Sequence, residues 1–118
     1  LVELLDLYPT LCDLTALPTP DQCEGSSLLP LLKDSQALWT DFAYSQYPRH
    51  GGVVGYSVKS PSARYTEWRS KKTNAIIARE YYDHQIDPDE NNNVADKREY
   101  QSEMTRLSVT LNKNLINK

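Results

Sequence analysis

Four short stretches of strand-like sequence between residues 39 and 83 constrain the fold of this chain more than any other feature. They are WTDFAYSQY (39–47), GGVVGYSVKS (51–60), ARYTEWRS (63–70) and AIIAREYYD (75–83). Their content of Val, Tyr, Thr and Trp is typical of β-strands, and turn-forming residues separate them. Because connections this short join antiparallel neighbours, the sequence predicts a four-stranded antiparallel meander.

A helix is predicted after the sheet. Asp96 and Glu99 have the spacing of a capping box. Apolar residues then recur at steps of three and four, at Tyr100, Met104, Leu107, Leu111 and Leu115. This stripe should pack on the sheet, with Met104 as a core residue. The fold class is therefore α+β, a four-stranded antiparallel sheet with a packed C-terminal helix.

The first segment, LVELLDLYPTLCDL (1–14), has leucines on most faces of a predicted helix. Its polar residues recur at helical spacing and predict a narrow solvent-facing stripe, at Glu3, Asp6, Thr10 and Asp13. With Asp6 as the N-cap, Pro9 falls in the first turn and the helix runs to about Leu17. A short helix is predicted at 28–32. A first helix with this much apolar surface predicts a partner domain that the chain lacks. The chain is therefore expected to be a piece of a longer protein.

Composition excludes several classes of function. The chain has 118 residues and a net charge of −3, from 13 basic and 16 acidic residues. It lacks the basic stripe that a nucleic acid requires, and no apolar run approaches the roughly twenty residues of a membrane span. Cys12 and Cys23 lack the spacing of a metal or redox site. Both are predicted to be free and mostly buried, with a disulfide between them as the alternative.

The segment YDHQIDPDENNNVAD (82–96) could be a metal site, an acid/base pair or a connector. A calcium loop needs oxygen ligands at alternate positions and a central glycine, and this segment has no glycine. His84 next to Asp83 would point to the opposite face of a strand. Asp-Pro and runs of Asn favour turns, so a connector is predicted, with no catalytic residue and no metal ligand in it.

The segment YSQYPRHGG (44–52) contains the candidate substrate-binding residues Tyr47, Arg49 and His50. They lie at a predicted strand end, before two glycines that permit a close approach of backbone or ligand. The planar guanidinium of Arg49 suits a carboxylate or a sulfate. The alternative is a surface hairpin with a solvated arginine, and the residues alone leave both open.

Several segments resemble one enzyme family. VELLDLYPTLCDLTALPTP and EGSSLLPLL resemble the segments that close the large domain of sulfatases in the alkaline phosphatase-like superfamily. AYSQYP, GYSVKSPSARYTEW and REYYDHQIDPDENNNVAD resemble the C-terminal subdomain of iduronate 2-sulfatase-like enzymes. The resemblance extends from Leu1 to about Leu111. It implies that residues 1–38 are the closing helix and connector of the large domain, and that residues 39–118 are the C-terminal subdomain.

The resemblance also implies where the chemistry lies. The catalytic formylglycine of such enzymes arises from a Cys or Ser in a C/S-x-P-x-R motif, and neither cysteine of this chain matches it. The formylglycine and a calcium ion are therefore expected in an N-terminal part, and this chain alone is expected to be inactive. Ser45 to Arg49 match an SQYPR motif near the mouth of the active site. The compact RHGGVVGYS connection departs from the family pattern, where relatives carry longer insertions.

The function implied is that of a sulfuric ester hydrolase acting on sulfated glycans that contain uronic acids. Its expected partners are the N-terminal sulfatase domain and the glycan, and its expected compartment is the periplasm, the exterior or the lysosome. Two alternatives remain: a stand-alone binding or interaction module, and the tail of a related phosphodiesterase or phosphonate hydrolase.

Overall fold

The computed structural model describes residues 1–116, which fall into two compact units. The N-terminal unit is Leu1–Asp41 and the sheet unit is Phe42–Lys118. The division after residue 38, into a closing segment of a large domain and a C-terminal subdomain, stays a prediction.

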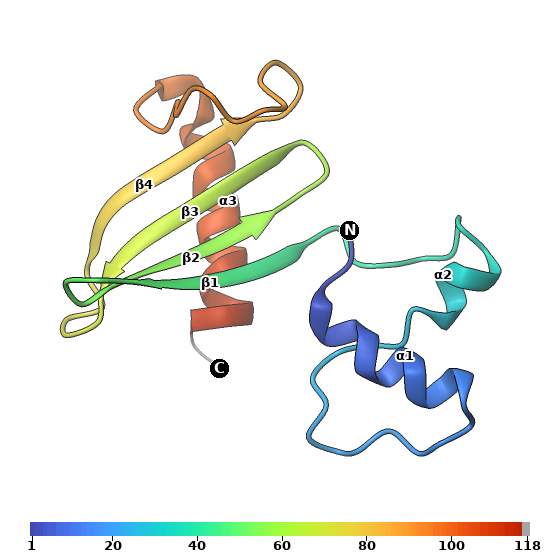
Figure 1. Cartoon of the computed structure of the whole chain (residues 1–118). Helices are drawn as coiled ribbons and strands as arrows, with labels where there is room; N and C mark the ends of the chain where they lie inside the picture. The colour runs from blue at the N-terminus through green and yellow to red at the C-terminus, as the bar shows by residue number, and fades with distance from the viewer. Residues whose placement is uncertain (117–118) are drawn as a thin grey trace. The chain divides into compact units, whose positions relative to one another are not determined.

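The sheet unit begins with the four strands of one antiparallel meander (Figure 1). They are β1 (Ala43–Arg49), β2 (Val53–Lys59), β3 (Ala63–Ser70) and β4 (Ile76–Asp83). Each strand pairs with the next along the chain, in the order β1-β2-β3-β4. The predicted meander is confirmed, because short polar connections leave each strand only its sequence neighbour to pair with.

Helix α3 (Gln101–Leu111) covers one face of this sheet, between a 3-10 turn, η2 (Arg98–Tyr100), and a π-helical turn, η3 (Asn112–Ile116) (Figure 1). The core joins sheet residues to the predicted helical stripe, through Val58, Tyr65, Tyr81, Met104, Leu107 and Leu111. Tyr100 and Leu115 pack at its margin. The predicted stripe and the α+β fold class are therefore confirmed.

The predicted capping box at Asp96 is wrong. The helical turns begin at Arg98, and Lys97 is the N-cap residue, with no side-chain capping bond. Lys97 has an extended backbone, so Asp96 lies one residue too early to cap. The chain is held there instead by Gln101, whose side-chain amide donates to the Ala95 carbonyl at 3.2 Å.

The N-terminal unit contains η1 (Leu4–Asp6), α1 (Leu7–Leu14) and α2 (Leu29–Lys33). Pro9 lies in the first turn of α1, as predicted. Asp6 is the N-cap residue of α1, as predicted, but its backbone is helical and its side chain makes no capping bond, because the 3-10 turn η1 already begins at Leu4. Helix α1 ends at Leu14 rather than Leu17, because Ala16 adopts a left-handed conformation (φ 54°) and the Leu17 N–H donates back to the Cys12 carbonyl at 2.9 Å.

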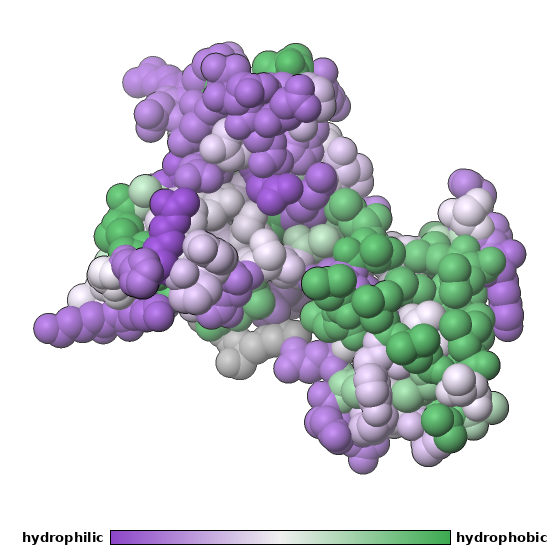
Figure 2. All heavy atoms as spheres, viewed as in Figure 1, coloured by the Kyte–Doolittle hydropathy of each residue, from purple (hydrophilic) through white to green (hydrophobic). Residues whose placement is uncertain are grey.

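Two of the four polar residues predicted to face solvent are buried instead, Asp6 and Thr10, whereas Asp13 is exposed as predicted. Asp6 and Thr10 are buried, because they bond the following loop: Asp6 Oδ1 accepts the Ser26 N–H and Thr10 Oγ1 accepts the Leu28 N–H, at 2.9 and 2.8 Å. The leucines are exposed instead and form what we call the leucine face, made of Leu4, Leu5, Leu7, Leu11, Leu14 and Leu17. Figure 2 shows hydrophobic residues gathered over this unit.

The structure also bears on the two cysteines and on the length of the helices. Cys12 and Cys23 are both free, Cys12 buried and Cys23 partly so. Within residues 1–116 no helix has the length and apolar character needed to cross a membrane.

Candidate functional site

The candidate residues Tyr47 and Arg49 lie on the face of the sheet opposite α3. Side chains alternate along a strand, so the residues of β1 between those facing the helix point to this other side. We call it the open face and define it by Tyr47, Arg49, Gly55, Trp68 and Glu80. Tyr47 pairs with Gly55, which pairs with Trp68, so these three form one row across the strands. His50 is exposed in the turn after β1.

Arg49 is neither a plain solvated arginine nor a member of an ion pair. Its guanidinium carbon lies 3.8 Å from the centroid of the Trp68 ring, which is a cation–π contact. Among the residues that the structure describes, Arg49 makes no salt bridge to a carboxylate. The open face therefore presents a cation that is held in place but not neutralised.

Trp68 is itself fixed on two sides. Its indole Nε1 donates to Glu80 Oε1 at 2.9 Å. Its ring lies against Gly55, where an added Cβ would come within 2.6 Å of ring atom Cζ3. Contacts that short do not occur in folded proteins, so position 55 requires a glycine for the indole to lie over β2.

A hollow of about 240 Å³ adjoins this row, with Tyr47, Trp68 and Arg64 among its lining residues. Its two carboxylates are already engaged. Glu80 also accepts from the Tyr82 hydroxyl at 3.4 Å, and burial followed by the Glu80 charge raises the pKa of Tyr82. Glu90 accepts from Arg64 Nε at 2.8 Å and lies 2.7 Å from His84 Nε2. The hollow can bind a polar group, but it holds no unpaired carboxylate positioned for acid/base work.

The loop after β4 bonds mainly to itself and to the sheet. Asp87 accepts the backbone N–H groups of Asn92 and Asn91 at 2.8 and 3.1 Å, and these bonds lower the pKa of Asp87. His84 contacts Glu90 rather than Asp83. The residue with a left-handed backbone is Glu90 (φ 58°), not an asparagine. Within residues 1–116 no three His, Cys, Asp or Glu side chains are grouped to hold a metal ion. The bonds of Asp87 within this loop are of the kind by which Asp and Asn side chains form turns.

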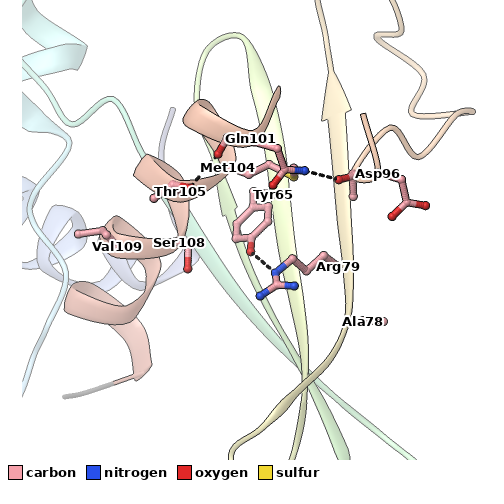
Figure 3. A pocket seen from close by; sticks show the side chains of 10 residues that line it. Tyr65, Ala78, Arg79, Asp96, Gln101, Met104, Thr105, Ser108 and Val109 are labelled. Atoms are coloured by element: carbon pink, nitrogen blue, oxygen red, sulfur yellow. Dashed lines mark hydrogen bonds between the residues drawn. The ribbon is translucent and has the colours of Figure 1, made fainter. Parts of the chain in front are cut away.

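A larger hollow, about 580 Å³, lies between β4 and α3 on the other side of the sheet (Figure 3). Its polar groups bond one another. Arg79 Nε donates to the Tyr65 hydroxyl at 3.2 Å, and that hydroxyl donates to Glu67 Oε1 at 3.0 Å. Glu67 is fully buried and paired with Arg69. Ser108 of α3 donates to the same carboxylate, so this network joins the helix to the sheet and we assign no chemistry to the larger hollow.

Comparison with known proteins decides the family. Residues 1–117 match the family model described as N-sulphoglucosamine sulphohydrolase, C-terminal. The chain belongs to this sulphohydrolase C-terminal family. The predicted resemblance to sulfatases is thereby confirmed.

Similar curated proteins are sulfatases. An arylsulfatase of Clostridium perfringens is 27% identical over 97% of this chain, and human arylsulfatase K is 31% identical over 81%. Iduronate 2-sulfatase of mouse is 33% identical, but over 58% of the chain. The matched regions are only 22%, 19% and 19% of these relatives, so the chain spans about a fifth of their length. The finer assignment to the iduronate branch stays a prediction.

A solved structure shares the fold of this family member. It superposes with a TM-score of 0.77 at 27% identity, covering 92% of this chain and 22% of the other. That structure is BT4656 in complex with its substrate, D-glucosamine-2-N,6-O-disulfate.

The sequence singled out Tyr47, Arg49 and His50 at a strand end but did not point to Trp68, Gly55 and Glu80. The signal was present in the turns. A turn centred on the two glycines pairs Arg49 with Val53, and a turn at 60–62 pairs Lys59 with Arg64. Counting along both hairpins from these pairs brings Trp68 opposite Gly55.

Proposed function

We propose that this chain is the C-terminal part of a sulfatase that hydrolyses sulfate esters of glycans, and that its open face forms part of the substrate-cleft wall. The observation that carries the proposal is the family match over residues 1–117. The related structure, bound to a sulfated glucosamine, supports a sulfated sugar as the substrate class. Arg49 is exposed and makes no salt bridge within residues 1–116, which supports a role in binding an anionic group of that sugar.

The proposed division of labour leaves the chemistry to an N-terminal part. A formylglycine there would supply the nucleophile, and a calcium ion would stabilise the sulfate oxygens. This chain would supply binding through Arg49, whose guanidinium donates charge-assisted hydrogen bonds to a carboxylate or sulfate. Tyr47 and His50 would flank the same anion, at the strand and in the turn.

The leucine face supports the proposed partner, the N-terminal sulfatase domain of the same protein. Six leucines exposed on one small unit form an apolar surface that a partner is needed to cover. A stand-alone binding module would be expected to carry polar residues there instead.

The finer proposal is an iduronate 2-sulfatase-like enzyme acting on a uronic-acid-containing glycan. The identity to mouse iduronate 2-sulfatase supports it, as does an arginine suited to the planar carboxylate of an acidic sugar. The compact His50–Val53 connection bears on specificity, because loops at a cleft shape the pocket.

The first experiment measures sulfate release from 4-nitrocatechol sulfate by this chain and by the full-length protein. Activity only in the full-length protein is expected. Disaccharides carrying a 2-O-sulfated uronate or a 6-O-sulfated glucosamine then identify the sugar. Activity on bis(4-nitrophenyl) phosphate without sulfate release would overturn the sulfatase assignment in favour of a phosphodiesterase.

Arg49→Ala in the full-length protein is expected to raise KM for a sulfated disaccharide about tenfold or more, because a hydrogen bond to a charged group contributes about 1.5–3 kcal/mol. The midpoint of thermal unfolding should stay unchanged, since Arg49 is exposed. Arg106→Ala is the matched control, since Arg106 is an exposed arginine on α3 that also lies near an aromatic ring, Phe42 at 5.6 Å. Equal effects of the two variants, or a joint loss of folding and activity, would contradict a binding role for Arg49.

A further inference from the structure

We propose that Trp68 is a positioning residue for Arg49: the indole, seated over Gly55 and anchored by Glu80, holds the guanidinium in its binding orientation before substrate arrives. This inference rests on the proposed function of Arg49. It assigns a role to three residues that lie outside the SQYPR motif.

The first step is the position of Arg49 itself. It is the last residue of β1, an edge strand, and it is exposed. A long side chain at such a place samples many rotamers, and binding a ligand would cost that freedom. The Trp68 ring, 3.8 Å from the guanidinium carbon, restricts those rotamers in the free protein. Contact with a ring face leaves N–H groups on the guanidinium edge available to an anion.

The second step is the seat of the indole. Tyr47, Gly55, Trp68 and Ala78 form one row across the four strands, so Trp68 has the two smallest residue types as its cross-strand partners. Gly55 leaves room for the ring on the side toward β1, where a Cβ would collide with it. The 2.9 Å bond from Nε1 to Glu80 fixes the ring from the side toward β4. The row and the bond together set one orientation of the indole.

The third step separates this role from a more familiar one. A half-buried tryptophan beside a hollow could stack directly on a sugar ring. Arg49 already lies over the ring of Trp68, so the group offered to the ligand is the cation. Trp68 then acts through Arg49, and its removal should have no effect once Arg49 is absent.

The contact is tested first without any activity, on the 118-residue chain with Leu7, Leu11 and Leu14 replaced by glutamine, because the exposed leucine face is expected to cause association of the unaltered chain. A guanidinium over an indole lies in the ring-current field, so the Nε–Hε resonance of Arg49 should be shifted upfield in a ¹H–¹⁵N spectrum. The shift should disappear in Trp68→Ala and persist in Trp39→Phe, which alters only the other tryptophan. An Arg49 resonance that is identical with and without Trp68→Ala would overturn the proposed contact.

The role is tested in the full-length protein by a double-mutant cycle. Trp68→Ala is expected to raise KM for a sulfated disaccharide about three- to tenfold with kcat nearly unchanged. Trp68→Phe, which keeps a ring face but loses the bond to Glu80, should recover part of the loss. Arg49→Ala/Trp68→Ala should equal Arg49→Ala alone, because Trp68 acts only through Arg49.

Gly55→Ala gives a second route if Trp68→Ala fails to fold, since it displaces the ring without removing it. It should raise KM to a similar extent. Additive effects of the two substitutions on KM would overturn the inference and favour direct stacking of Trp68 on the sugar. If Trp68→Ala left KM unchanged while Arg49→Ala raised it, Trp68 would have no positioning role. A neutral Arg49→Ala, or the absence of sulfatase activity, would instead overturn the proposed function on which the inference rests.

Discussion

Two tyrosine side chains of the sheet unit titrate far from their ordinary range. Burial raises the pKa of Tyr65 to about 12, with the nearby Glu67 carboxylate as the next cause. Burial also raises the pKa of Tyr81 to about 12, followed by the charge of Glu103. Both phenols belong to the core between the sheet and the helix, so their ionisation is linked to the stability of the helix–sheet packing.

The direction of the linkage follows from the raised values. A folded-state pKa above the unfolded value of about 10 means that the folded protein binds the phenolic proton more tightly. This stabilisation is fully present below about pH 10 and is lost as the pH rises from 10 to 12. We therefore expect the free energy of unfolding, measured with urea at pH 9, 10 and 11, to fall above pH 10. Absorbance at 295 nm should show late-titrating tyrosines, one fewer in Tyr81→Phe. A single step near pH 10 for all eight tyrosines would contradict this.

At the scale of elements, one buried polar joint sets how α3 lies on the sheet. Glu67 of β3 is fully buried and accepts from the Ser108 hydroxyl of α3 at 2.5 Å, besides pairing with Arg69. Arg69 in turn donates to Asn112 Oδ1 at 2.9 Å. Apolar contacts alone tolerate sliding, whereas a satisfied buried network favours one register.

Removing the Glu67 carboxylate should lower the free energy of unfolding. Glu67→Ala leaves Arg69 buried without its partner, and breaking a buried pair in this way costs about 3–5 kcal/mol. Urea unfolding of the 118-residue chain measures this loss. Glu103→Gln is the control: Glu103 pairs with Arg106 at the surface, and such a pair contributes at most about 1 kcal/mol. Similar losses in the two variants would show that the joint adds nothing beyond a surface ion pair.

The elements were predictable from the sequence to the extent that periodicity determines them. Alternation and short turns located all four strands, and the three- and four-residue steps located the buried face of α3. The failure of the capping box at Asp96 was not predictable, because a cap depends on the backbone conformation of its neighbours, such as the extended Lys97. The candidate site was predictable in part. Tyr47 and Arg49 lie close together in one short segment of the sequence, whereas the position of Trp68 depends on the register across two hairpins.

For the whole molecule, the main feature is the leucine face of the N-terminal unit. The side chains of Leu7, Leu11 and Leu14 are 50%, 60% and 56% exposed, although they come from one short helix. Apolar patches of this kind cause association when their natural cover is absent. Two polar residues that could have made this surface more hydrophilic bond inside the unit instead, Asp6 and Thr10.

We therefore expect the isolated 118-residue chain to self-associate. Replacing Leu7, Leu11 and Leu14 with glutamine should restore a monomer, since each change adds polar surface without touching the buried side of α1. Light scattering coupled to size-exclusion chromatography gives the mass across a concentration series. Val109→Gln, at a single exposed apolar position on α3, should leave the association unchanged. A wild-type chain that stays monomeric at tens of micromolar would contradict the expectation.

The meander has a consequence for how the chain is made. Every strand of the sheet pairs with the strand that immediately follows it, so assembly requires only short loops to close, and such folds form quickly. The leucine face precedes this sheet in the chain and leaves the ribosome first. At roughly 5–20 residues per second, synthesis of the sheet unit takes on the order of several seconds. During that interval the leucine face is exposed while the sheet unit is still being synthesised. If the proposed N-terminal domain has already folded by then, it would cover the leucine face and protect the nascent chain from aggregation.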